Sequence, residues 1–145
     1  MREPLPDRLG YLLKHAQLQY AAMSAAILEP YGVTGRELAV LIELAAGEPA
    51  SQQEAARRLG IDRTTMVALL DALEARGLVE RRPHAEDRRR NVVEVTRAGR
   101  DALHHANAAA EEAELRFLAP LSAADARRFK DTLRILISQS RSQSG

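Results

Sequence analysis

Arginine is concentrated in one short segment of the chain, RRPHAEDRRRNVVEVT, which covers Arg81–Thr96. Five arginines fall within its first ten positions, and the alternating NVVEVT that follows places Val93 and Val95 on one face. A guanidinium donates hydrogen bonds in a planar fork, which suits phosphate groups and the edges of bases. The preceding LVERR also has the composition of a strand. We therefore expect two strands around a charged loop, although most runs of charge are simply solvated.

Upstream of this segment, two helices are expected with a very short connection. Ser51–Glu54 (SQQE) has the pattern of a capping box and begins a helix that ends at Gly60. Asp62 is a suitable N-cap for the next helix, which ends at Gly77. Because only LGID separates the two, the layout is that of a helix-turn-helix. Two strands around a charged loop directly after such a motif form a wing.

The first turns of these two helices carry side chains that suit contact with DNA. In a helix-turn-helix the second helix reads bases with its N-terminal residues, here Arg63, Thr64 and Thr65. Arg63 could donate two hydrogen bonds to guanine, and the threonines could reach a phosphate or a thymine methyl group. Ser51 and Gln52 begin the preceding helix and could bind backbone phosphate. Taken alone, RTT is only a polar first turn, but the order of the motifs favours DNA contact.

Further helices are expected on both sides of the motif. Apolar spacing and capping signals give one helix that stops at Pro30 and Gly32, one from Thr34 to Gly47, one from Arg97 to about Phe117, and one after Ser122–Asp125. The tail Ser138–Gly145 is expected to fray. The expected fold class is therefore mainly α with a small β-wing, in a single domain: a winged helix-turn-helix with additional helices at both termini.

The composition of the chain excludes several classes of protein and of site. The 145 residues carry a formal net charge of +1, but positions 51–100 hold 11 basic and 8 acidic residues, a modest local excess of positive charge. No cysteine is present, which excludes disulfides and thiolate metal sites. The histidines have poor spacing for a metal, and no catalytic or cofactor motif is found, so we expect neither an enzyme nor a cofactor. No apolar run is long enough to span a membrane, and a cytoplasmic location is expected.

The order of elements resembles the MarR family of winged-helix transcriptional regulators. The closest correspondence is LGIDRTTMVALLDALEARGLVERRPHAEDRRRNVVEVTRAG, Leu59–Gly99, which resembles that family's recognition helix, wing tip and return strand. The resemblance implies that Arg89 is the wing tip and reaches the minor groove, with Arg88 and Arg90 beside it and Asp87 holding it by an ion pair. Ala68 departs from the pattern, because many members have a polar or basic residue there. Candidates for further backbone contact are Arg57, Arg76, Arg81 and Arg82, although Arg76 could instead only favour the C-terminus of its helix.

The resemblance also implies partners. Apolar faces on the terminal helices would be hard to bury within so small a core, and in the family these helices interlock with a second subunit. We expect a homodimer on an imperfect palindrome, with residues of about 34–100 as the DNA-binding part and about 5–29 and 101–140 as dimerisation helices. A repressor responding to a small aromatic acid is expected, and His15 is a candidate ligand contact. The alternative is a winged-helix module that binds another protein.

Overall fold

The computed structural model describes residues 2–48, 50–87 and 91–142. Two 3-10 turns, six helices and three strands follow one another in these ranges: η1 Leu5–Asp7, α1 Leu9–Leu28, η2 Glu29–Tyr31, α2 Gly35–Ala45, β1 Ala50–Ser51, α3 Gln52–Leu59, α4 Arg63–Ala75, β2 Val79–Pro83, β3 Asn91–Val95, α5 Arg97–Leu118 and α6 Ala123–Ser142. This is the mainly α architecture with a β-wing that the sequence predicts.

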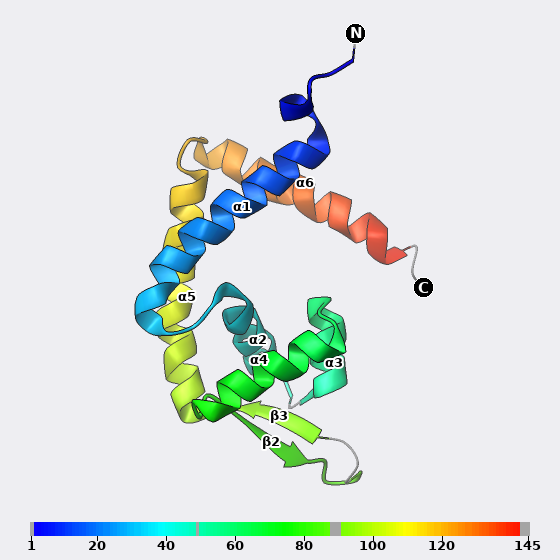
Figure 1. Ribbon diagram of the computed structural model, residues 1–145, viewed down its shortest axis with the longest axis vertical. Helices are drawn as coiled ribbons and strands as arrows, with labels where there is room; N and C mark the ends of the chain where they lie inside the picture. The colour runs from blue at the N-terminus through cyan, green and yellow to red at the C-terminus, as the bar shows by residue number, and fades with distance from the viewer. Residues whose placement is uncertain (1, 49, 88–90, 143–145) are drawn as a thin grey trace.

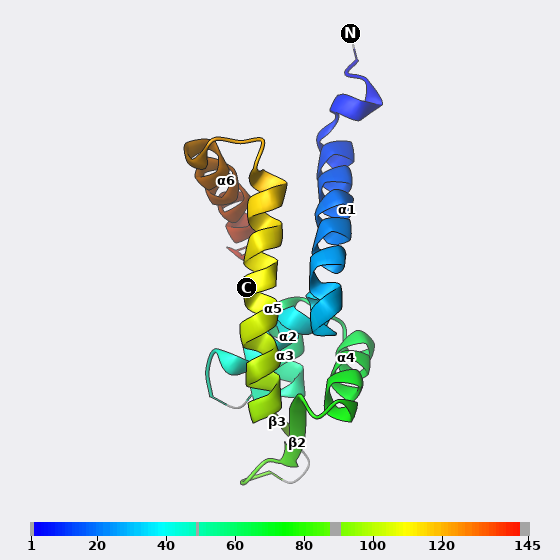
Figure 2. The same ribbon diagram turned by 90° about the vertical axis from the view of Figure 1, so that its left-hand side faces the viewer.

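The elements form a head and an arm (Figure 1). The head contains α2, α3, α4 and the small sheet. The arm consists of α5, which rises from the sheet, α1 beside it, and α6, which turns back from the far end of α5 (Figure 2). No helix within the described ranges combines the length and apolar character that a bilayer crossing requires.

Side-chain caps begin the helices where the sequence predicts them. The Thr34 hydroxyl accepts a hydrogen bond from Glu37 N, and the Glu37 carboxylate accepts one from Thr34 N, which completes the first capping box. Thr96 caps α5 by accepting from Gly99 N, at 3.1 Å. In the box predicted at Ser51–Glu54, the structure gives the bond from Glu54 N to Ser51 Oγ, at 3.2 Å.

The sheet has the antiparallel order β1-β3-β2. In β2 and β3, Val79 lies opposite Val95 and Arg81 opposite Val93, so the buried valines of the two strands face the head. The strand β1 was not predicted: Ala50 and Ser51 pair with Val93 and Val92. This third strand joins the start of α3 to the base of the wing.

The core of the head is built from side chains of α2, α4, β2 and β3, with Leu28 from the end of α1. Its fully buried large residues are Leu28, Val40, Leu41, Met66, Leu70, Leu73, Val79 and Val93. In the arm, by contrast, the buried positions of α5 are small, Ala106, Ala109 and Ala113, so that α1 packs closely against it. The larger apolar side chains of the arm, unlike these alanines, remain exposed to solvent.

Those uncovered side chains lie on the two terminal helices. Leu9 and Leu12 of α1 and Ile135, Leu136 and Ile137 of α6 are each more than half exposed. The fraying predicted for Ser138–Gly145 is wrong as far as Ser142, because α6 is continuous from Ala123 to that residue; residues 143–145 lie outside the described residues.

Candidate nucleic-acid interface

The helices α3 and α4 form the predicted helix-turn-helix. Gly60 ends α3 in the left-handed region, with φ of 64°, and its amide bonds back to the carbonyls of Ala56 and Arg57. Ala55, Ala56 and Met66 are buried where the two helices meet. The tight turn and this contact fix the angle at which the start of α4 is presented.

The first turn of α4 is held by Asp62. One carboxylate oxygen accepts a hydrogen bond from Thr65 N at 2.8 Å, and the other accepts from the Thr65 hydroxyl at 2.6 Å. The bond from the Thr65 hydroxyl, followed by that from its amide, holds the pKa of the Asp62 carboxyl below its ordinary value. Thr65 is thus occupied within the cap, whereas Arg63 and Thr64 are exposed.

The structure brings Arg63 together with residues from the start of α3. Gln52 and Arg57 of α3 line a hollow of about 240 Å³ with Arg63 and Met66 of α4. Neither Arg57 nor Arg63 forms an ion pair with any residue in the described ranges. Two unpaired guanidiniums and an amide therefore meet on one surface. Ser51 lies next to it, with its hydroxyl oxygen committed to the α3 cap.

The wing is described only up to the loop. His84 orders the segment that follows β2: its ring Nδ1 accepts hydrogen bonds from Glu86 N at 3.1 Å and Asp87 N at 3.2 Å. The predicted wing-tip residues Arg88, Arg89 and Arg90 lie outside the described residues, as does the predicted ion pair of Arg89 with Asp87. The strands β2 and β3 themselves lie at the end of the head farthest from the arm (Figure 1).

Three of the four further arginine candidates have partners inside the protein. Arg81 is only 19% exposed and forms ion pairs with Asp71 and Glu74 of α4. Arg82 pairs with Glu80 at 3.0 Å and Glu94 at 3.7 Å, and Arg76 is bonded to Glu37. For Arg76 and Arg81 the expectation of phosphate contact is therefore replaced by a structural role. Of the four, Arg57 alone is both exposed and without an ion-pair partner among the described residues.

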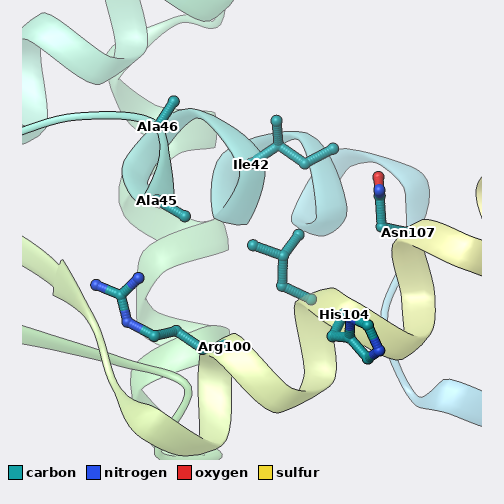
Figure 3. A pocket seen from close by; sticks show the side chains of 7 residues that line it. Ile42, Ala45, Ala46, Arg100, His104 and Asn107 are labelled. Carbon is teal, nitrogen blue, oxygen red and sulfur yellow. The ribbon is translucent and has the colours of Figure 1, made fainter.

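A second hollow lies between α2 and α5 (Figure 3). It has a volume of about 430 Å³, with an apolar wall that includes Ile42, Ala45, Ala46 and Leu103. Its polar side comes from α5, where Arg100, His104 and Asn107 share one face. A cation, an imidazole and an amide beside an apolar wall would suit a planar molecule that carries a carboxylate.

The residue predicted from the sequence for this role, His15, lies elsewhere. His15 lies on the exposed side of α1, where its ring packs on Tyr11 with centroids 3.9 Å apart, and it does not line either hollow. The prediction missed Arg100, His104 and Asn107, which lie at positions i, i+4 and i+7 of α5, a spacing that puts them on one helical face. That signal was available in the sequence.

Comparison with known proteins tests the family directly. A model of the MarR family matches residues 31–90. The transcriptional repressor Mb2911 of Mycobacterium bovis is 32% identical over 125 residues, which is 86% of this chain and 90% of the relative. The chain belongs to the MarR family.

Other members of the MarR family extend the comparison. The transcriptional repressor NicR of Pseudomonas putida KT2440 is 29% identical over 93 residues, 64% of this chain and 59% of NicR. The solved structure of the repressor CouR bound to a 23-mer DNA duplex is 33% identical, covers 97% of this chain and 99% of that one, and gives a TM-score of 0.81. CouR from Rhodococcus jostii RHA1 bound to p-coumaroyl-CoA is 29% identical, covers 93% and 95%, and gives 0.80.

Proposed function

We propose that this MarR-family chain is a dimeric transcriptional repressor that reads DNA with α4 and the wing and releases or tightens its grip when a small aromatic acid binds beside α5. The observation that carries the DNA-binding part is the exposed first turn of α4, where Arg63 and Thr64 project from a capped helix and Arg63 has no ion-pair partner in the described ranges. The CouR complex with DNA, a protein of the same fold over nearly the whole chain, supports it.

In this proposal each element has one task. Arg63 and Thr64 contact base edges in the major groove, Gln52 and Arg57 contact phosphate, and the wing arginines 88–90 enter the minor groove. Residues of about 34–100 form the DNA-binding part, and the helices at about 5–29 and 101–140 join two subunits. Two copies of α4 would then read the two halves of an imperfect palindrome. Binding and not catalysis is the activity we assign, in the compartment that contains the operator, the cytoplasm.

Replacing Arg63 by alanine is expected to weaken binding to the operator by about ten- to a hundredfold, the cost of losing a bidentate base contact. The loss should depend on sequence, so that binding to unrelated DNA falls much less. Fluorescence anisotropy on a labelled duplex, selected from a random pool by the wild-type protein, measures both affinities at several salt concentrations.

The matched control is Arg116→Ala. Arg116 is an arginine of α5 that pairs with Glu112 at 2.6 Å, far from the head. This variant loses the same charge and should bind like the wild type. Equal affinities for Arg63→Ala and wild type would remove Arg63 from the interface. A wild-type protein that binds no DNA, or binds with no salt dependence, would favour the alternative of a protein-binding module.

The effector part of the proposal rests on the hollow between α2 and α5. Its Arg100 would pair with a carboxylate, and the apolar wall with Ile42 and Leu103 would cover an aromatic ring (Figure 3). The CouR structure with p-coumaroyl-CoA supports the aromatic part of this effector class; the acyl group of that ligand is a thioester, so the pairing of a carboxylate with Arg100 rests on the hollow alone. Since α5 runs from the wing to the arm, a ligand wedged against it would alter how the head is held.

Replacing Arg100 by glutamine is expected to weaken the binding of p-coumarate by at least about tenfold, because a hydrogen bond to a charged group is lost. Isothermal titration calorimetry measures the affinity, and the neutral amide of the same acid should bind wild type and variant about equally. Arg97→Gln is the matched control, since Arg97 is exposed one turn earlier on α5 and does not line the hollow. If Arg97→Gln loses as much affinity as Arg100→Gln, the ligand lies elsewhere.

A further inference from the structure

Glu37 is an unusual side chain for its position. It is a carboxylate with only 8% of its side chain exposed, and among the described residues it is the one buried charged group. Burying an ionised carboxylate is costly unless both oxygens are bonded. One Glu37 oxygen accepts from Thr34 N at 3.0 Å, and the other accepts from the guanidinium of Arg76. The second oxygen of the capping residue Glu37 is therefore satisfied by a residue from another part of the chain.

Arg76 donates three hydrogen bonds in this arrangement, and 37% of its side chain stays exposed. It stands at the C-cap of the recognition helix α4, and each of its three guanidinium nitrogens has an acceptor. Nε donates to Ala72 O at 3.2 Å, Nη1 donates to Gly32 O, and Nη2 donates to the Glu37 carboxylate. Because the guanidinium is planar and its acceptors lie on three sides, these bonds fix its orientation. A single exposed ion pair would leave the guanidinium free to rotate.

The three acceptors belong to three different elements. Ala72 is on α4, Glu37 is on the first turn of α2, and Gly32 is in the left-handed turn, φ 70°, that follows α1 and η2. Figure 2 shows the lower end of α1 beside α2. Arg76 thus connects the recognition helix to the end of α1, the helix that carries the exposed leucines of the arm.

We propose that Arg76 is a positioning residue for DNA recognition: by binding Gly32 and Glu37 it fixes α4 relative to the α1 arm and so sets the separation of the two recognition helices in the dimer. We assign it this role without contact with DNA, and the dependence of DNA affinity on salt, described below, tests that assignment. The inference rests on the proposed function for its consequence on DNA, but the fixed separation is a property of the dimer alone. The two are therefore tested separately.

The absence of cysteine makes the separation measurable. Ala68→Cys places one nitroxide label on the exposed side of α4 in each subunit, and dipolar electron paramagnetic resonance gives the distance distribution between the two labels. We expect a single narrow distribution in the otherwise wild-type dimer and a clearly broader one with Arg76→Gln. Arg76→Lys keeps a charge beside Glu37, and therefore the fold, but cannot span all three acceptors; it should broaden the distribution as well.

Arg97→Gln in the same labelled background is the control, because Arg97 is exposed at the start of α5, outside the residues assigned to the subunit interface, and forms no ion pair with any described residue. Its distribution should match the parent. Distributions for Arg76→Gln and Arg76→Lys that are as narrow as the parent's, in proteins that thermal unfolding shows to be folded, would overturn the proposal.

The consequence for DNA is read with unlabelled protein on two duplexes, the selected palindrome and the same sequence with one base pair inserted between its halves. Wild type should lose about tenfold or more in affinity on the inserted duplex, a cost like that of a mismatched site. Arg76→Lys should reduce this discrimination to about threefold or less, whereas loss of folded protein would weaken both duplexes equally and keep the ratio.

The dependence of affinity on salt separates positioning from direct contact. An arginine that neutralises a phosphate contributes about 0.9 to the log–log slope, so a positioning residue leaves the slope unchanged when it is replaced. A slope reduced by about one in Arg76→Gln would overturn the proposal in favour of phosphate contact. If wild type binds no palindrome while the label distances still broaden in both Arg76 variants, the proposed function fails and the positioning role in the dimer stands.

Discussion

Replacing Gly99 by alanine is expected to lower the free energy of unfolding by about 3 kcal/mol or more, because the new methyl group has no space. A Cβ built at Gly99 would lie 2.0 Å from the carbonyl oxygen of Leu78 and 2.7 Å from a methyl carbon of Val95. Since a typical domain is stable by only about 5–15 kcal/mol, such a loss is a large fraction of the total.

The surrounding backbone has little freedom to move away. Leu78 O accepts a hydrogen bond from Thr96 N at 3.1 Å, and Leu78 N donates to Leu73 O at 2.9 Å. The Thr96 hydroxyl donates to Gly77 O at 2.6 Å while it caps α5 through Gly99 N. The end of α4, the start of β2 and the start of α5 are therefore bonded together around the missing side chain.

Urea unfolding followed by far-ultraviolet circular dichroism measures the loss, at one fixed protein concentration because dimer stability depends on it. Gly35→Ala is the matched control: Gly35 is also in the first turn of a helix, but a Cβ there meets nothing within 4 Å. It should change the free energy of unfolding by less than about 1 kcal/mol. Equal midpoints for the two variants would show that the junction relaxes around the methyl group.

Replacing Ile137 by aspartate is expected to separate the subunits and to weaken binding to the palindrome by about a hundredfold or more. Ile137 is 58% exposed in the single chain, beside Leu136 and Ile135 on α6. In the proposed dimer this face is covered, and an unpaired carboxylate there would be costly to bury. Loss of the second subunit removes the gain from binding two half-sites at once, which commonly amounts to about 10²–10⁴.

Sedimentation velocity over a range of concentrations measures the subunit equilibrium, and anisotropy measures the DNA affinity of the same samples. Gln139→Asp introduces the same charge two positions further along α6, where the side chain is polar and exposed. It should remain dimeric and bind normally. A stable Ile137→Asp dimer would show that α6 does not provide the interface.

Much of the fold was predictable because the signals that begin its helices are local in the sequence. The cap of α2 joins Thr34 to Glu37 and that of α4 joins Asp62 to Thr65, pairs that lie three positions apart. Such signals fix where helices begin without knowledge of the rest of the molecule. The strand β1 was not predicted, because two residues are too few to show a periodic pattern. Ala50 and Ser51 are strand residues because they pair with β3, about forty positions later in the chain.

The candidate site was less predictable because the availability of a side chain depends on its tertiary partners. Arg76, Arg81 and Arg63 are equally cationic in the sequence. In the structure, Arg76 binds Glu37, 39 positions away, and Arg81 binds Asp71, ten positions away, whereas Arg63 remains unpaired among the described residues. Likewise, the shared face of Arg100, His104 and Asn107 could be read from spacing, but the apolar wall opposite it depends on how α2 packs against α5.

The straight course of α5 from the wing to the far end of the arm makes it a lever. Its 22 residues span about 33 Å at about 1.5 Å per residue. A tilt of about 5° around the arm end would carry the head sideways by about 3 Å, close to the rise of one base pair, about 3.4 Å along a strand. An effector therefore has no need to unfold or rebuild anything: a change in angle smaller than the usual scatter of helix packing suffices to move α4 out of phase with its groove.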